Sequence, residues 1–135
     1  MLQTEVPPPG PVVTTTGLLR LSCLSSDAAV RVTMIGDLDV ATVPQLDQVL
    51  RRAQADARVV VLDLRGLRFI GCGGVKLMLE TDDRVRQAGG RFVVVRGSSE
   101  AERLFALVAI DGRLDFVDQP ADHVAPALAG HLPEL

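Results

Sequence analysis

The chain has 135 residues, the size of one domain, and its composition of 47% hydrophobic and 23% charged residues is that of a globular protein. Its formal net charge is −3 and it has no tryptophan or tyrosine, so the usual features of a nucleic-acid-binding module are missing. No apolar run reaches the roughly 18 to 20 residues of a membrane-spanning helix, and the N-terminus lacks the pattern of a secretory signal. We therefore expect a cytoplasmic protein that contacts neither nucleic acid nor membrane directly.

Residue types that usually carry catalysis or bind metals are scarce. The two histidines, His123 and His131, both lie in the last thirteen residues. The two cysteines, Cys23 and Cys72, have neither the spacing of a metal site nor the number of a disulfide framework. We interpret Cys23 as a small core residue. The sequence thus favours a binding module over an enzyme, and it predicts no cofactor and no metal.

The first part of the chain changes character near residue 17. Residues 1–16 include Pro7-Pro8-Pro9 and Pro11, and we expect them to form a disordered or loosely held arm. Alternating apolar residues then predict a β-hairpin, with strands around residues 19–23 and 30–34. The predicted domain spans residues 17–130, and residues 131–135 form a C-terminal tail.

A helix is predicted after the second strand. Gly36-Asp37-Leu38-Asp39 leaves that strand, and Thr42-x-x-Gln45 is a capping-box pattern with Pro44 in the first helical turn. The expected buried stripe of this helix consists of Val43, Leu46, Leu50 and Ala53.

Residues 59–79 are the stretch around which the chain is arranged. The aliphatic run at residues 59–62 predicts a strand over residues 59–64 that is covered on both faces and leaves the sheet near residues 63–66. Gly71-Cys72-Gly73-Gly74 then opens a helix over residues 75–88, which Gly89-Gly90 ends. Leu77 is off the stripe predicted for that helix, so we expect it to be exposed. The stripe consists of Val75, Met78, Leu79, Asp82 and Val85.

The remaining pattern predicts two further strands and one or two further helices. Residues 92–95 are typical of a buried strand and residues 114–117 of a short edge strand. Ser99-x-x-Glu102 is a second capping box, before a helix near residues 101–108, and a short, imperfect helix follows Pro120. The predicted fold class is α/β, with a mixed sheet of about five strands and three to four helices mostly on one face. The predicted order is β-β-α-β-α-β-α-β-(α).

The glycine-rich turn at residues 71–74 has two interpretations. Backbone amides at a helix start lack partners and lie at the positive end of the helix dipole, which suits an anion or a partner protein. Alternatively, the glycines only allow the backbone to make a sharp turn, and no ligand binds there. A P-loop is excluded because Lys76 follows Gly74 too closely and no Ser or Thr comes after it; a dinucleotide fingerprint lacks its third glycine.

Several segments together resemble the STAS domain of the bacterial anti-sigma factor antagonist type, from about residue 18 to residue 128. They are Gly36-Asp37-Leu38-Asp39 with Ala41-Thr42, the strand at 59–64, the segment from Phe69 to Val75, Gly89-Gly90 with the strand from Phe92, and Ala101-x-Arg103-Leu104-Phe105. The resemblance implies a STAS-like fold and a protein–protein switch that regulates transcription. In this family the antagonist binds an anti-sigma factor, often a serine kinase of the histidine-kinase-like ATPase type, and thereby frees the sigma factor.

This chain differs from the family it resembles at the phosphorylation motif. There, the kinase phosphorylates a serine in an Asp-Ser-Ser-Gly motif at the helix start, and the added charge of about −1.5 to −2 breaks the complex. Here Gly73 stands at the position of that serine and Gly71 at that of the aspartate. The resemblance thus implies an antagonist without this switch. Ser98 and Ser99 are alternative acceptors, although helix capping already explains them.

The residues expected at the partner surface come from the glycine-rich turn and the preceding loop. They are Asp37, Asp39, Thr42, Gly71, Cys72, Gly73, Gly74, Lys76 and Leu77. Asp37 and Asp39 have a second interpretation as solvated loop carboxylates that help to start the next helix.

An alternative function is a STAS-type sensor, in which the turn binds a small anion or nucleotide, or Cys72 responds to redox state. Lys76 is the only lysine of the chain, and its charge and the amides of the turn both favour a thiolate at Cys72. The other interpretation of Cys72 is a small filler in place of serine.

Overall fold

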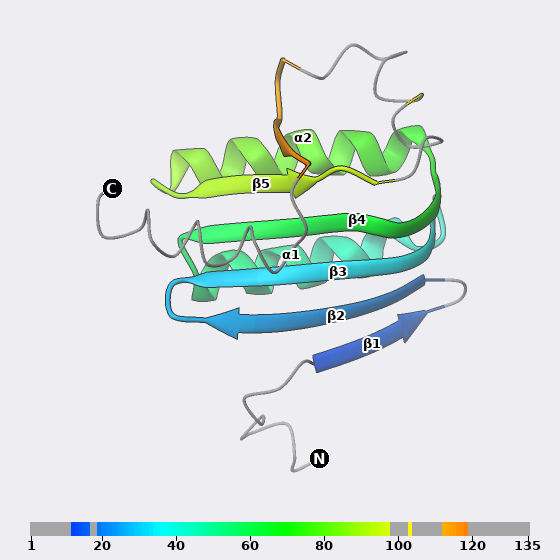
Figure 1. Cartoon of the computed structure of the whole chain (residues 1–135), viewed down its shortest axis with the longest axis horizontal. Coiled ribbons are helices and arrows are strands. Elements are labelled where there is room, and N and C mark those ends of the chain that lie inside the picture. Colours follow the sequence, from blue (N-terminus) through cyan, green and yellow to red (C-terminus); the bar gives the residue numbers. More distant parts are fainter. Residues whose placement is uncertain (1–11, 17–18, 98–102, 104–111, 119–135) are drawn as a thin grey trace.

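The computed structural model describes residues 12–16, 19–97, 103 and 112–118, and these form one six-stranded sheet with two helices (Figure 1). The strands are β1 (Val12–Thr16), β2 (Leu19–Ser26), β3 (Ala29–Leu38), β4 (Val59–Ile70), β5 (Arg91–Val95) and β6 (Asp115–Val117). The helices are α1 (Val43–Asp56), after β3, and α2 (Cys72–Gln87), after β4. The strands lie in the sheet in the same order as in the chain.

The sheet changes from antiparallel to parallel pairing at β3. Strands β1, β2 and β3 pair antiparallel, whereas β3, β4, β5 and β6 pair parallel. Parallel neighbours need a crossover connection, and α1 and α2 provide the first two. The predicted α/β class with a mixed sheet is confirmed.

Strand β1 corrects the prediction for the N-terminal arm. The sequence predicts a loose segment over residues 1–16. In the structure, however, all five residues from Val12 to Thr16 pair with β2. All five residues of β1 are valine or threonine, and β-branched residues favour extended backbone. The described sheet therefore has six strands, one more than predicted.

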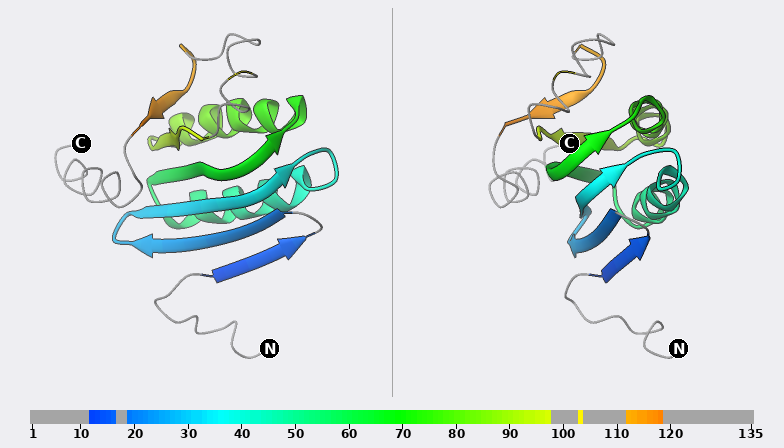
Figure 2. Two further views of the ribbon diagram at one scale, coloured as in Figure 1. Left: turned by 45° about the vertical axis from the view of Figure 1, so that its right-hand side comes forward. Right: turned by 90° about the vertical axis from the view of Figure 1, so that its right-hand side faces the viewer.

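Both described helices cover the same face of the sheet (Figure 2, right view). The predicted helices at residues 101–108 and after Pro120 fall outside the described residues, apart from Arg103. Neither α1 nor α2 is long and apolar enough to span a membrane, and the described part of the chain has no other helix with those properties.

The main core lies between the sheet and these two helices. Successive strand residues point to opposite faces, so every second residue enters this core. Its fully buried members include Leu19, Leu21, Val32, Met34, Val60, Leu62, Leu64, Phe92 and Val94 from the strands, Leu46 and Leu50 from α1, and Met78 and Val85 from α2. A smaller cluster on the other face contains Ala29, Val59, Val61, Val93 and Val95. The valine runs of β4 and β5 are thus buried on both faces, as predicted.

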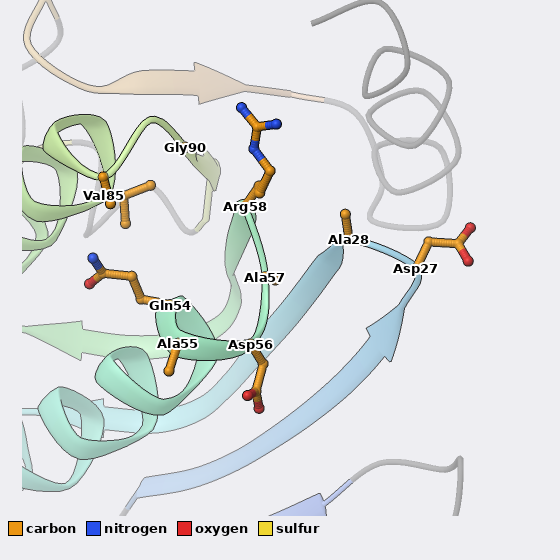
Figure 3. Close-up of a pocket in the computed structure, with 10 residues that line it drawn as sticks. Asp27, Ala28, Gln54, Ala55, Asp56, Ala57, Arg58, Val85 and Gly90 are labelled. Atoms are coloured by element: carbon orange, nitrogen blue, oxygen red, sulfur yellow. The ribbon is translucent and has the colours of Figure 1, made fainter.

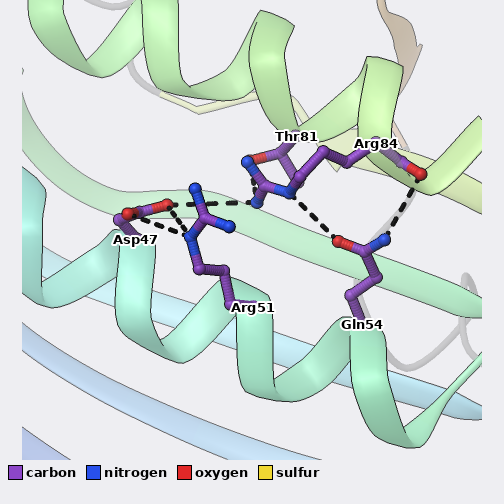
Figure 4. A network of polar contacts seen from close by, with 5 residues as sticks. All are labelled: Asp47, Arg51, Gln54, Thr81 and Arg84. Atoms are coloured by element: carbon purple, nitrogen blue, oxygen red, sulfur yellow. Dashed lines mark hydrogen bonds and ion pairs between the residues drawn. The ribbon is translucent and has the colours of Figure 1, made fainter.

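A polar network joins α1 to α2 (Figure 4). Arg84 Nε donates a hydrogen bond to Gln54 Oε1 at 3.2 Å, and Gln54 Nε2 donates to the Arg84 carbonyl oxygen at 3.3 Å. Arg84 also donates to Thr81 Oγ1 and lies 3.9 Å from Asp47, which pairs with Arg51 one turn along α1. The network holds α1 and α2 together at a distance from their first turns.

Strand β4 is longer than predicted. It continues through residues 63–66 and ends at Ile70. Its register against β3 shifts between Thr33 and Ile35 and again between Gly36 and Asp37. Because of these irregularities Leu64, Leu67 and Ile70 all face the main core, although they are three residues apart. A regular strand, in which every second residue faces the core, would not place all three there.

Helix α2 begins earlier than predicted, at Cys72, so Gly71 is its N-cap and the glycine-rich segment forms its first turn. The prediction that Leu77 is exposed is wrong, because Leu77 is only 4% exposed and belongs to the main core. Helix α2 contacts α1, β4 and β5, so it buries a wider arc than the predicted stripe. That arc consists of Gly74, Val75, Leu77, Met78, Thr81, Asp82 and Val85.

Candidate partner-binding surface

The loop between β3 and α1 and the start of α2 lie side by side at the carboxyl ends of β3 and β4 (Figure 1). The amide of Gly71 donates a hydrogen bond to the Leu38 carbonyl oxygen at 2.9 Å, which ties the two segments together. Leu38 also pairs with Ile70 at the last position of the β3–β4 ladder. The fold therefore brings together the two segments that the sequence predicts at the partner surface.

The start of α2 exposes backbone amides. Gly71 has extended backbone, no side chain caps the helix, and its first turn has no acidic residue. The Gly71 carbonyl accepts from the amides of Gly74 and Val75 at 3.0 and 3.3 Å, but within the described residues the amides of Cys72 and Gly73 have no acceptor. These two amides lie at the positive end of the helix dipole and can receive an acceptor from another molecule.

The predicted site residues of α2 divide into an exposed and a buried group. Cys72, Gly73 and Lys76 are exposed, whereas Gly74 and Leu77 are buried. Leu77 therefore cannot contact a partner unless the core opens.

The glycines of the turn differ in the space around them. A Cβ atom on Gly73 would meet only Val43, at 3.8 Å, so a side chain fits there. A Cβ on Gly74 would lie 2.6 Å from Leu38 Cδ2 and 3.1 Å from Ile70 Cγ1, which is too close without a shift. Gly74 is thus required for packing, whereas Gly73 is free to be a larger residue.

Thr42 shapes the β3–α1 loop instead of forming the predicted capping box. Its side chain makes no capping bond to α1. Thr42 Oγ1 accepts from the Asp39 amide at 2.9 Å, and the hydroxyl can donate to the Asp37 carbonyl oxygen at 3.0 Å. Asp39 Oδ1 in turn accepts from the amides of Ala41 and Thr42. Thr42 is 3% exposed, so its role is to hold the loop rather than to contact a partner.

Asp37 pairs with a residue that the sequence analysis does not single out. Arg68 donates from Nε and Nη2 to the two Asp37 carboxylate oxygens, each at 3.1 Å. The Arg68 side chain is 68% exposed. The pair joins β3 to β4 at the rim of the surface. Because it is exposed, its contribution to stability is roughly 0 to 1 kcal/mol.

Two exposed apolar side chains at this end are also missed by the sequence analysis. Val40, in the β3–α1 loop, is 89% exposed, and Phe69, next to the start of α2, is 49% exposed. An aromatic ring half open to water beside unpaired amides is typical of a contact surface. We call Val40, Phe69, Cys72 and Gly73 the docking surface.

The family of the chain follows from comparison with known proteins. Residues 23–125, most of the sequence and all of the docking surface, match the family model of the STAS domain. The chain belongs to the STAS domain family. Strand β1 lies before the segment of the STAS domain that the family model covers.

Known proteins of similar sequence or structure include an osmosensory protein and anti-sigma factor antagonists. Osmosensory protein A of Mycobacterium tuberculosis is 28% identical over 96 residues, which are 71% of this chain and 61% of that protein. The chain thus spans less than two thirds of the length of this relative. An anti-sigma factor antagonist from Mycobacterium paratuberculosis has a similar structure, with a TM-score of 0.71 and 24% identity over 80% of this chain and 92% of that one. The anti-sigma factor antagonist SpoIIAA in its unphosphorylated form gives a TM-score of 0.72 and 17% identity, over 82% of this chain and 96% of that one. At these identities the likeness to solved structures establishes the fold.

The two cysteines of this STAS domain lie in different surroundings. Both are free. Cys23 packs against the main core, and its burial raises the pKa of its thiol, with Arg52 acting in the opposite direction. Cys72 is exposed at the first position of α2. Cys23 is thus the small, partly buried core residue that the sequence predicts.

A shallow cavity of about 390 Å³ lies at the opposite end of the sheet (Figure 3). It is lined by the β2–β3 turn, the end of α1 and the start of β4, including Asp27, Gln54, Asp56 and Arg58. It therefore shares no residue with the docking surface. The part of the chain that the structure describes has no group of three or more His, Cys, Asp or Glu side chains arranged to hold a metal ion.

Proposed function

We propose that this STAS domain is an anti-sigma factor antagonist, which binds an anti-sigma factor through the docking surface and so releases a sigma factor. The observation that carries the proposal is the pairing of exposed apolar side chains with unpaired helix amides at the α2 start. The STAS family membership and the fold shared with known antagonists support it. The partner's class, including a serine kinase of the histidine-kinase-like ATPase type, rests on the resemblance in sequence.

The docking surface provides two kinds of contact. Val40 and Phe69 can lose exposed apolar area to a partner, which contributes about 25 cal/mol per Å² before the costs of association. The amides of Cys72 and Gly73 can receive a partner carboxylate, which the helix dipole and Lys76 both favour. The surface would therefore select a partner that has an apolar side chain for Val40 and Phe69 and, beside it, a carboxylate for the amides of Cys72 and Gly73.

The proposed antagonist lacks the family's phosphorylation switch. Gly73 has no hydroxyl, and Cys72 and Gly74 beside it have none either. The space around Gly73 would accommodate a serine side chain, so packing does not require glycine at this position. Ser98 and Ser99, the alternative acceptors, lie outside the described residues.

Binding to a purified anti-sigma factor, encoded beside this chain or captured with it, tests the proposal. We expect Val40→Glu and Phe69→Glu each to weaken binding about tenfold or more in a calorimetric titration, because each places a charge in a buried apolar contact. Ala55→Glu is the matched control, since Ala55 is also an exposed apolar residue but lies near the end of α1, at the opposite end of the sheet. Equal affinity for all three variants would reject this docking surface.

The unpaired amides of Cys72 and Gly73 also favour a second candidate, a sensor in which they bind a small anion or nucleotide. Thermal-shift measurements with phosphate and nucleotides distinguish the two: a sensor predicts a ligand-dependent rise in melting temperature, and an antagonist predicts none. For the redox form of this candidate, alkylation of Cys72 should be much faster than that of the less accessible Cys23, and oxidation of Cys72 should reduce partner binding.

A further inference from the structure

Among the described residues, no helix or strand packs on the face of β2 and β3 that lies opposite α1 and α2 (Figure 2). Around β4 and β5 this face carries the buried valine cluster. Over β2 and β3, in contrast, Leu24 is 37% exposed, Ile35 is 50% exposed and Arg20 is exposed. Neither helix of the described part covers this face (Figure 2).

Strand alternation identifies the residues on this open area. Leu19 and Leu21 of β2, and Val30, Val32 and Met34 of β3, belong to the main core. Cys23 of β2 also packs against this core. The residues that alternate with these core residues along β2 and β3 therefore point to the opposite face. We call them the β2–β3 patch: Arg20, Ser22, Leu24, Arg31, Thr33 and Ile35.

The register of β2 against β3 gives the patch a regular pattern. Leu24 lies opposite Arg31, and Ile35 lies opposite Arg20, so each exposed aliphatic side chain has an arginine as its cross-strand neighbour. The Ser22–Thr33 pair separates the two. The distance from one Arg/aliphatic pair to the other is four strand residues, or about 13 Å.

The patch has positive charge that nearby carboxylates do not neutralise. Asp63 is paired with Arg65, and Asp37 is paired with Arg68. Within the described residues Arg20 and Arg31 form no ion pair, and the Nε atom of Arg31 is buried without a hydrogen-bond acceptor. A buried donor without an acceptor is unfavourable. The guanidinium of Arg20 is exposed and can receive an incoming carboxylate, even though the chain as a whole has a net charge of −3.

We propose that the β2–β3 patch is a second docking site, which binds an acidic amphipathic helix of a partner protein. The aliphatic side chains suit the apolar face of such a helix, and the arginines suit its carboxylates. The spacing of about 13 Å corresponds to roughly nine helical residues, so two to three turns would cover the patch. This site is distinct from the docking surface at the α2 start, and the inference does not depend on the proposed function.

Fluorescence anisotropy with a designed helical peptide tests the proposal. The probe is a labelled peptide of about five helical turns, with leucines on one face and glutamates beside them, and its counterpart has lysine in place of every glutamate. We expect the full chain to bind the glutamate peptide in preference to the lysine peptide, and less tightly at high salt. Charge reversal at both positions (Arg20→Glu with Arg31→Glu) should weaken binding about tenfold or more.

Two controls keep the test specific. Arg52→Glu makes the same charge change at an exposed arginine of α1, on the other side of the sheet, and should leave binding unchanged. Arg20→Glu alone carries the test if Arg31→Glu lowers the melting temperature, since Arg20 is exposed. In methyl NMR spectra the Ile35 signal should shift on peptide binding, whereas that of Ile70, which is 5% exposed, should not.

Three results would overturn the proposal. Absence of glutamate-peptide binding, or equal binding of both peptides, would show that the patch does not select an acidic helix. Binding that survives charge reversal of Arg20 and Arg31 would place the peptide elsewhere. A concentration-dependent Ile35 shift in the protein alone would assign the patch to a second copy of this chain.

Discussion

Thr42 Oγ1 accepts a hydrogen bond from the backbone amide of Asp39 at 2.9 Å, and this contact closes the loop that presents Val40. Thr42→Val keeps the shape of the side chain but leaves the Asp39 amide without this acceptor. We expect a loss of roughly 1 to 3 kcal/mol in the free energy of unfolding, measured by urea denaturation. Thr42→Ser retains the oxygen and should lose much less. Equal losses for valine and serine would show that the methyl group, and not the hydroxyl, is important.

Leu77 belongs to the main core, so its truncation should affect stability. Leu77→Ala should cost about 2 to 5 kcal/mol, the range for removing a buried leucine side chain. Lys76→Ala, at the exposed neighbouring position, should change stability by no more than about 0.5 kcal/mol. Chemical denaturation of both variants measures the contrast. A Leu77→Ala protein as stable as Lys76→Ala would contradict the packing of α2.

Gly73 and Gly74 should respond differently to serine. Gly73→Ser fits the space beside Val43 and should leave the melting temperature nearly unchanged. Gly74→Ser places Cβ against Leu38 and should lose about 1 to 3 kcal/mol through overpacking. Thermal unfolding of the pair tests the difference, and equal melting temperatures would mean that Leu38 moves aside without cost.

The Gly73→Ser variant also tests the absence of a phosphorylation switch. If the partner is a serine kinase, ATP should dissociate its complex with Gly73→Ser but not its complex with the wild-type chain. The new phosphate would add about −1.5 to −2 charges at the contact. Mass spectrometry locates the phosphate. Release of the wild-type chain through phosphate on Ser98 or Ser99 would contradict an antagonist free of phosphorylation control.

Asp82 should make stability depend on pH in an unusual direction for a carboxylate. Its burial raises its pKa, with Asp83 and Asp115 adding to the rise and Arg86 opposing it. A carboxyl group with a raised pKa in the folded state stabilises the protein below its unfolded pKa, and that contribution is lost as pH rises through the folded pKa. The Asp82→Asn variant should therefore gain stability relative to the wild type between about pH 3 and pH 7. A relative gain at acidic pH instead would show that the Arg86 pair dominates.

Much of the fold could be predicted because the strongest patterns are local. The aliphatic runs of β4 and β5 indicate strands buried on both faces. In α1, Leu46, Leu50 and Ala53 of the predicted stripe are buried, and Val43, its fourth member, is partly buried against the core. Strand β1 was harder to predict, because its valines and threonines follow a proline-rich segment and their pairing partner β2 supplies the decisive hydrogen bonds.

The candidate site depends on contacts between segments, and the sequence indicates only part of it. The exposure of Phe69 follows from shifts in the β3–β4 register, which turn Leu67 and Ile70 inward. The burial of Leu77 follows from the elements that surround α2. Thr42 forms bonds within its own loop, an alternative to helix capping that the same residue type permits. Val40 was detectable as an isolated aliphatic residue in a polar loop, but only the structure shows how exposed it is.

The measurement that tests the central claim most directly is release of a sigma factor from its complex with the anti-sigma factor. Free sigma factor is quantified while one of three proteins is added: the wild-type chain, the double variant with Val40→Glu and Phe69→Glu, or the control variant Ala55→Glu. We predict release by the wild-type chain and by Ala55→Glu, and little or none by the double variant, with all three proteins equally folded by circular dichroism. Release by the double variant at the wild-type concentration, or no release by the wild-type chain, would contradict the account.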